Sequence, residues 1–215
     1  MKSFRILVVV LFSVVALVST GFAQTDSASV PAAVSEFQRQ NAVTLRVEVS
    51  SSGQLMFDDL SGVLVNDQFV LTVASPLLEF TGGQAMVIIR SKDRILRAQL
   101  ASYMPESGIA LFILSEKVSY MPFKFQEWKD QVDPENDLWL VTDKNISSLS
   151  GDNWRGMKIE KGSIIIDEKG QLSAIVVGVQ DGIPMVIPWE AFQNFQKAID
   201  EFLGKNIKEI GLDKI

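Results

Sequence analysis

Short apolar segments separated by polar turns recur along most of this chain, and this pattern limits the folds open to it. Between residues 43 and 49, apolar and polar side chains alternate with a period of two, which is typical of a half-buried strand. Asn66-Asp67 and Ser91-Lys92-Asp93 each separate two such segments, as in β-hairpins. The succession predicts an all-β barrel or sandwich. The predicted strands are 43–49, 61–65, 69–74, 85–90, 95–102, 108–114, 138–141, 163–166, 172–179 and 183–187.

The last predicted element is a helix. Apolar residues follow Pro188 at helical spacing, and Gly204 comes directly after the last of them, where a helix C-terminus favours glycine. We expect the resulting apolar face to dock on the barrel, and a partner-binding face is the alternative. The residues of this face are Trp189, Phe192, Phe195, Ile199, Phe202 and Leu203.

The N-terminus predicts an export signal. Lys2 and Arg5 precede an apolar run from Ile6 to Val18, and small residues then lead to a cleavage position after Ala23. An uncleaved anchor is the alternative, although this run is shorter than the roughly 18 apolar residues of a spanning helix. We therefore expect an exported protein, periplasmic or extracellular, with no membrane span in its mature chain.

These patterns divide the chain into four segments. Residues 1–23 are the expected signal peptide, 24–41 a flexible leader, 42–204 the folded domain and 205–215 a C-terminal tail. Loss of the signal peptide leaves 18 basic against 26 acidic residues, a net charge of −8. Because the chain also has no Lys/Arg cluster, nucleic acid and anionic lipid are disfavoured partners. No pattern indicates an oligomeric state.

The sequence contains neither cysteine nor histidine. An exported chain without cysteine must be held together by its core alone. Zinc, haem and thiol chemistry lose their usual ligands, so we expect no cofactor. Carboxylates could still bind calcium, but Asp58-Asp59 and residues 133–137 lack the ligand spacing and the glycine of an EF-hand loop.

Four segments carry a more specific pattern. Residues 61–65 are Ser-Gly-Val-Leu-Val, 69–75 are Phe-Val-Leu-Thr-Val-Ala-Ser, 104–111 are Met-Pro-Glu-Ser-Gly-Ile-Ala-Leu, and 162–178 contain a Lys-Gly turn. In order and spacing they resemble the GSGVII, VLTNxH, DPxxDLAL and GNSGGPLVNxxGEVIGI motifs of HtrA/Deg-like trypsin-fold serine proteases. The resemblance covers roughly residues 42–203 and implies a trypsin-like double β-barrel with a C-terminal helix.

The resemblance also implies that the second barrel is trimmed. Only twenty positions separate Val141 from Lys161, where the family has a longer region of loops and hairpins. An incomplete barrel leaves strand edges exposed, and such an edge can accept a peptide strand by backbone hydrogen bonding.

The resemblance places the catalytic positions of the family on Ser75, Gly108 and Lys161. The family has histidine, aspartate and serine there: aspartate orients the imidazole, histidine takes the proton and serine attacks. None of the three residues in this chain can do that work. Ile159 and Glu160 occupy the glycine-rich oxyanion loop of the family, where a β-branched side chain and a carboxylate both oppose acyl transfer. We therefore expect no proteolytic activity.

The function implied is that of an inactive pseudoprotease, which acts as a scaffold that binds a protein or peptide. One alternative is an active hydrolase of the same class that uses a Ser75/Lys161 pair, which requires a buried lysine with a depressed pKa. A second alternative is an unrelated all-β domain. Trp128 and Trp154 lie in polar contexts and could line a binding groove.

Overall fold

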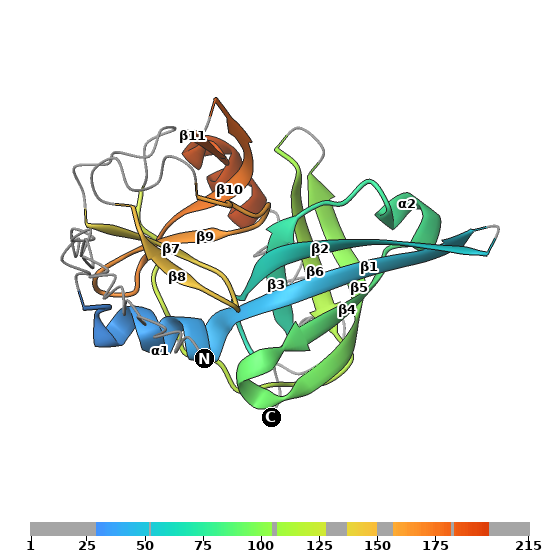
Figure 1. The fold of residues 1–215 in the computed structure, drawn as a ribbon, viewed down its shortest axis with the longest axis horizontal. Helices are drawn as coiled ribbons and strands as arrows, with labels where there is room; N and C mark the ends of the chain where they lie inside the picture. The colour runs from blue at the N-terminus through green and yellow to red at the C-terminus, as the bar shows by residue number, and fades with distance from the viewer. Residues whose placement is uncertain are drawn as a thin grey trace, which may run out of the picture.

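The computed structural model describes residues 29–51, 53–104, 107–127, 137–149, 157–181 and 183–197. They form two β structures that lie side by side (Figure 1). The first is a closed antiparallel barrel of six strands, and the second is a curled five-stranded sheet that forms a half-barrel. This architecture is compatible with a trypsin-like double barrel and confirms the predicted all-β class with a trimmed second half.

The barrel strands are β1 (Ala42–Ser51), β2 (Gln54–Leu64), β3 (Phe69–Val73), β4 (Gln84–Ile89), β5 (Arg94–Met104) and β6 (Ile109–Leu114). Their order is β1-β2-β3-β6-β5-β4, and β1 closes the barrel by pairing with both β2 and β4. Asn66 shapes the predicted β2–β3 hairpin, because its side-chain oxygen accepts the backbone N–H groups of Gln68 and Phe69. β6 lies between β3 and β5 and is almost entirely buried, as its apolar sequence predicts.

The second sheet has the strands β7 (Leu138–Val141), β8 (Ile146–Ser148), β9 (Ile164–Asp167), β10 (Leu172–Gln180) and β11 (Ile183–Val186). Their order is β11-β10-β9-β7-β8, so β11 and β8 are edge strands and the sheet stays open. The predicted turn between β9 and β10 is stabilised by Asp167, whose carboxylate accepts the N–H groups of Lys169 and Gln171.

The leader differs from the expectation. Part of the segment predicted to be flexible, residues 24–41, forms the helix α1 (Ala32–Asn41). Val34 and Phe37 lie on one face of α1 and are fully buried, and Phe37 packs edge-on against Phe123 with ring centroids 5.1 Å apart. These two apolar side chains dock the short helix, together with Gln38, which donates to the carbonyl oxygen of Thr142 at 2.9 Å. The predicted signal peptide and C-terminal tail lie outside the described residues.

The closing helix is present over residues 189–197. Phe192 and Phe195 are buried in the common core, and Phe192 packs against Phe125 with ring centroids 4.9 Å apart. The described part of this face, Trp189, Phe192 and Phe195, therefore docks on the rest of the molecule, as predicted, whereas Ile199, Phe202, Leu203 and Gly204 lie outside the described residues. The other helices among the described residues are single turns, α2 (Leu78–Thr81) and η1 (Arg90–Lys92). Within the described ranges, no helix combines the length and the apolar character needed to cross a membrane.

Polar contacts tie the two β structures together. The Asn41 side chain donates to the carbonyl oxygen of Met121 at 2.7 Å and accepts the N–H of Met121 at 2.8 Å, which fixes α1 to the segment that connects the barrel to the second sheet. Arg90 of η1 pairs with Asp143, between β7 and β8, at 2.8 Å. The Arg90–Asp143 pair thus joins the barrel to the second sheet, while the Asn41 pair anchors the segment between them.

Candidate functional site

The three positions singled out by the resemblance lie on segments that contact one another. The residue before Ser75 donates its N–H to the carbonyl oxygen of Gly108 at 2.8 Å. The carbonyl oxygen of Lys161 accepts the N–H of Ser61 at 3.0 Å. Thr72, three residues before Ser75, donates its hydroxyl to the carbonyl oxygen of Ser61 at 2.5 Å. The contacts gather all three positions in one region, where the barrel meets the second sheet.

Ser75 is only 4% exposed and has a structural partner. Its Oγ accepts the N–H of Leu77 at 3.1 Å, and its carbonyl oxygen accepts the N–H of Leu78 at 3.1 Å. The serine thus shapes the turn that leads from β3 into α2. A nucleophilic hydroxyl would have to be free to approach a substrate, so this environment suits a structural role better than a catalytic one.

Lys161 has an exposed side chain. In the part of the chain that the structure describes, no hydrogen bond or ion pair reaches its ammonium group, and none joins it to Ser75. A lysine that serves as the base for a serine must be buried enough for its neutral form to be favoured. Lys161 is exposed and therefore does not meet this requirement.

Glu160 places negative charge beside Lys161. Its carboxylate lies 3.4 Å from the hydroxyl of Ser61, within hydrogen-bonding distance, and 3.9 Å from the ammonium nitrogen of Lys144. The Glu160 carbonyl oxygen accepts the Ser163 hydroxyl at 2.6 Å, which holds this turn in place. A fixed carboxylate here would repel an oxyanion that formed nearby, which opposes acyl transfer.

Gly162 lets the second sheet approach the barrel closely. Its φ is +79°, and a Cβ at this position would lie 1.9 Å from the carbonyl oxygen of Ser61 and 2.7 Å from the hydroxyl of Thr72. Only glycine fits both the backbone conformation and the space. On its other side, Gly162 donates its N–H to the carbonyl oxygen of Val176 at 2.8 Å, which joins the turn to β10.

An open backbone edge begins where this turn ends. Residues 172–176 of β10 pair with β9 and with Ser163. Beyond Val176, none of the described residues pairs with β10 on this side, although β11 pairs with it on the other side. Residues 177–180 are half-buried or exposed, so an extended segment could add to the sheet along them.

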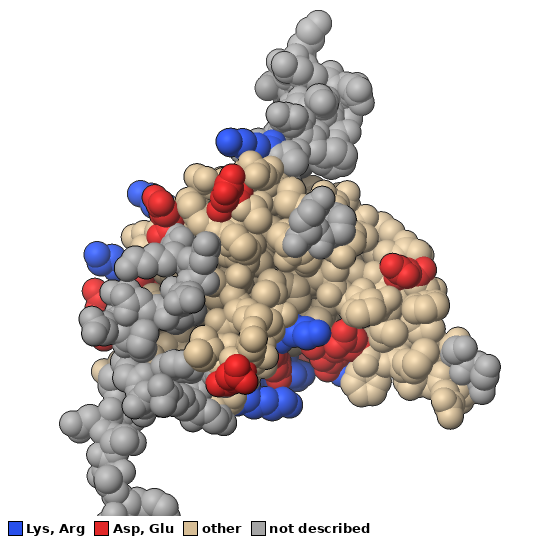
Figure 2. Space-filling model, turned by 90° about the horizontal axis from the view of Figure 1, so that it is seen from above, with Lys and Arg blue, Asp and Glu red and all other residues tan. Residues whose placement is uncertain are grey.

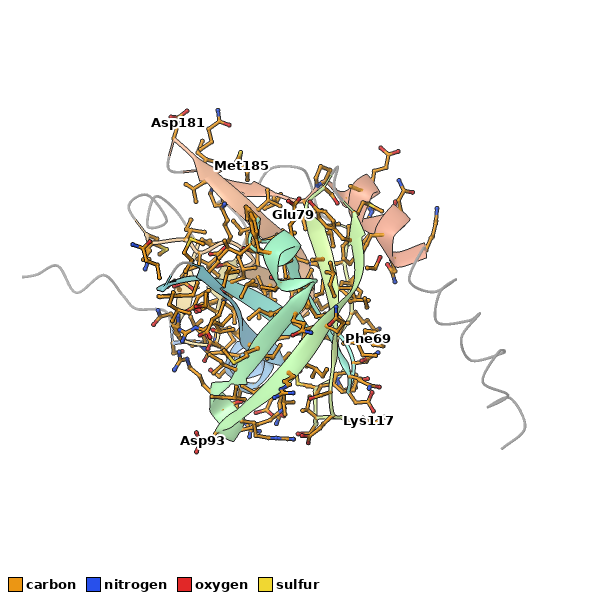
Figure 3. The ribbon with its side chains drawn as sticks, turned by 90° about the vertical axis from the view of Figure 1, so that its right-hand side faces the viewer. Phe69, Glu79, Asp93, Lys117, Asp181 and Met185 are labelled. Atoms are coloured by element: carbon orange, nitrogen blue, oxygen red, sulfur yellow. The ribbon has the colours of Figure 1, made fainter. Side chains whose placement is uncertain are left out.

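Exposed apolar side chains lie on this end of the sheet: Val179 on β10, and Ile183 and Met185 on β11, the strand that pairs with the other side of β10. Figure 3 shows Asp181 and Met185 together at one end of the molecule, with Glu79 of α2 on the same side. Figure 2 looks down on the molecule from above and shows a broad area without charged side chains, with charged groups toward its margins. A partner with apolar side chains would fit this environment.

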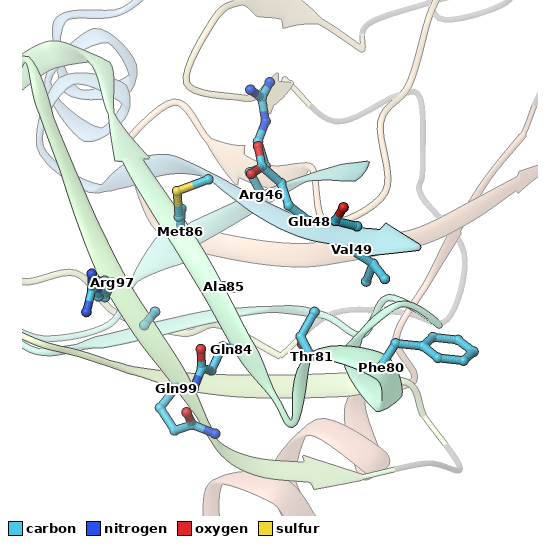
Figure 4. A pocket seen from close by; sticks show the side chains of 12 residues that line it. Arg46, Glu48, Val49, Phe80, Thr81, Gln84, Ala85, Met86, Arg97 and Gln99 are labelled. Carbon is cyan, nitrogen blue, oxygen red and sulfur yellow. The ribbon is translucent and has the colours of Figure 1, made fainter. Parts of the chain in front are cut away.

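Among the hollows in the described part of the molecule, we consider two. One, of about 210 Å³, lies between β7 and residues 157–160 and includes Glu160 in its lining. The other, of about 660 Å³, lies where β1 separates from β4, and its lining includes Arg46, Arg97 and Met86 (Figure 4). Among the described residues, no group of three or more acidic side chains could hold a metal ion. Trp128 and Trp154 lie outside the described residues, so their groove stays a prediction.

Comparison with known protein-family models and with curated proteins gives no match. The strand order and the open second half are compatible with a trypsin-like double barrel, and no family is shown beyond that.

Proposed function

We propose that this chain is an exported, catalytically inactive relative of the HtrA/Deg-like trypsin-fold proteases and that it binds an extended peptide segment. The observation that supports this proposal is a chain of backbone contacts: Ala74 donates to Gly108, Ser61 donates to Lys161, and Gly162, next to Lys161, donates to Val176, where the open edge of β10 begins. The frame of a protease site is thus combined with residues that cannot transfer a proton from serine to a leaving group.

The bound segment would extend the second sheet. Its backbone would pair with residues 177–180 of β10, and strand addition of this kind supplies affinity through main-chain hydrogen bonds. An apolar side chain of the segment would contact Val179, while the next one would point to the opposite face. The net negative charge of the chain favours a neutral or basic partner over an acidic one.

A peptide-display experiment tests the binding role. Random heptapeptides displayed on phage are selected on the purified protein, and a selected peptide is then made with N-methyl groups at alternate residues. We expect N-methylation in one of the two alternate registers to abolish binding, because it removes the donors that pair with β10. Val179→Asp should weaken binding, whereas Ile95→Asp, which changes an exposed residue of β5, should not. Equal binding by both N-methylated forms and the parent would contradict strand addition.

A labelling experiment tests the loss of catalysis. The purified protein is treated with a fluorophosphonate, which reacts with activated serines, and is analysed by mass spectrometry. We expect no adduct, because the hydroxyl of Ser75 is buried and bonded to the Leu77 N–H. An adduct on Ser75 that disappears in Lys161→Ala would instead establish the Ser75/Lys161 hydrolase.

A further inference from the structure

β1 and β2 continue beyond the barrel as a two-stranded ribbon, which extends to the right in Figure 1. β1 pairs with β4 only as far as Arg46, and β2 pairs with β3 only from Gly62 onward. The pairing of β1 with β2, in contrast, continues without a register shift to the Ser51–Gln54 pair. We call residues 47–51 and 54–58 the arm. Among the described residues, the arm has no third strand on either side.

The arm exposes a run of large apolar side chains. Leu55, Met56 and Phe57 are 63%, 44% and 59% exposed, and they follow one another on β2. An isolated two-stranded ribbon is only marginally stable in water. A ribbon that exposes three consecutive large apolar residues is therefore expected to gain stability when another surface covers it.

The two edges of the arm differ in their surroundings. The edge of β1 faces the larger hollow, and Figure 4 shows Val49 directed toward Thr81 and Phe80 of α2. The edge of β2 has no such neighbour among the described residues. Natural edge strands are usually protected by lysine, proline or a bulge. Residues 54–58, Gln-Leu-Met-Phe-Asp, contain no lysine and no proline, and their register with β1 has no bulge.

We propose that two copies of this chain associate through the β2 edges of their arms, antiparallel about a two-fold axis at Met56. The two arms would then form a continuous four-stranded sheet. In this register Met56 lies opposite Met56 of the second copy, Leu55 lies opposite Phe57, and Asp58 lies opposite Gln54. The contact uses the same patch on both copies, as a two-fold dimer requires.

The charge pattern of the edge favours a second copy in this register. Every apolar residue from 55 to 57 meets an apolar residue, and no carboxylate lies directly opposite another, which would be destabilising. A two-fold axis at Phe57 would instead place Asp58 opposite Met56 and Asp59 opposite Leu55. The edge is thus self-complementary in the Met56 register, and this pairing is separate from peptide binding at β10.

Cysteine cross-linking tests the register, because the chain has no cysteine of its own. Directly opposed residues in antiparallel strands have Cβ atoms about 4.5–5.5 Å apart, close to the separation in a disulfide. We expect Met56→Cys to give a disulfide-linked dimer as its main product on mild oxidation. Ile95→Cys, on the exposed face of β5, should stay mostly monomeric. Equal cross-linking of the two variants, or none in Met56→Cys, would overturn the proposal.

The oligomeric state provides a second test that needs no cross-link. Sedimentation equilibrium of the purified protein should show a dimer in equilibrium with a monomer. Leu55→Lys should raise the dissociation constant more than about tenfold, because it replaces an apolar contact with Phe57 of the second copy by a charged side chain. Its circular dichroism spectrum should not change, because Leu55 is exposed in the single chain. A wild-type protein that remains monomeric at its highest soluble concentration would refute the association and leave the β10 site unaffected.

Discussion

The carbonyl oxygen of Ser61 lies 1.9 Å from the point that a Cβ on residue 162 would occupy, so Gly162 sets how closely the second sheet approaches the barrel. The same oxygen accepts the hydroxyl of Thr72, and the N–H of Ser61 donates to the carbonyl oxygen of Lys161. Ser61 thus contacts both β structures through its backbone. This junction holds the candidate site together, and its residues are the first targets for mutation.

Gly162→Ala should strongly destabilise the protein. The added methyl group would overlap the carbonyl oxygen of Ser61, and alanine at a φ of +79° is strained as well, so we expect a loss of more than about 3 kcal/mol or failure to fold. Gly82→Ala is the matched control, because Gly82 has a φ of +62° but no atom within 4 Å of its would-be Cβ. It should lose only about 1–2 kcal/mol. Urea unfolding followed by circular dichroism measures both, and equal losses would show that the close approach is unimportant.

Thr72→Val tests the hydrogen bond at the junction. The valine keeps the shape of the threonine but removes the buried donor to Ser61, so the free energy of unfolding should fall by about 1–3 kcal/mol. Thr81→Val removes a longer, half-buried hydrogen bond of 3.2 Å within α2 and should have a smaller effect. If the two variants unfold at the same urea concentration, the Thr72 hydroxyl does not stabilise the junction.

Much of the fold could be predicted because each strand has a recognisable pattern in its own residues. The alternation in residues 43–49 and the Asn66-Asp67 turn are visible without any long-range information, and both predictions are confirmed. α1 was missed because its docking depends on Phe123, a residue far away in the sequence. β8 was missed because Ile146–Ser148 is too short to show a period.

The candidate site could be predicted only in part. The resemblance pointed to positions 75, 108 and 161, and in the structure the segment before Ser75 contacts Gly108 while Lys161 contacts Ser61. The roles of Ser61 and Thr72 were not foreseen, although polar residues within apolar strands are a signal, since buried polar groups need partners. The alternation of apolar and polar residues also does not predict where the pairing between two strands ends. The open edges of the arm and of β10 therefore emerge only from the register of the strands.

Asn41→Asp should lower the free energy of unfolding at neutral pH, and this loss should depend on pH. An ionised carboxylate can still accept the N–H of Met121 but cannot donate to its carbonyl oxygen, so we expect a loss of about 2–4 kcal/mol at neutral pH. Burial raises the pKa of such a carboxyl. The deficit relative to wild type should therefore shrink as the pH falls and the carboxyl gains a proton that it can donate.

Asn66→Asp is the control for this prediction. Asn66 uses only its side-chain oxygen, which accepts the N–H groups of Gln68 and Phe69, and a carboxylate can do the same. This variant should remain within about 0.5 kcal/mol of wild type at neutral pH. Thermal unfolding of both variants between neutral and mildly acidic pH makes the comparison, and a similar loss in both would show that the amide donor of Asn41 contributes nothing.

Asp59→Asn should remove part of the acid sensitivity of the fold. Arg46 donates two hydrogen bonds to the Asp59 carboxylate, at 2.7 and 2.8 Å, and these bonds and its charge lower the pKa of Asp59 in the folded state. A lowered folded-state pKa adds stability above the unfolded-state pKa of about 3.9, and this stability is lost as the pH falls further.

Because both side chains of the Arg46–Asp59 pair are partly exposed, we expect the pair to contribute about 1 kcal/mol or less at neutral pH. The free energies of unfolding of wild type and Asp59→Asn should therefore differ at neutral pH and converge as the pH falls below the lowered folded-state pKa of Asp59. Glu116→Gln, which breaks a more exposed pair with Arg94, should cause a smaller loss at neutral pH. A constant difference between wild type and Asp59→Asn across this range would show that the Arg46–Asp59 pair does not couple folding to protonation.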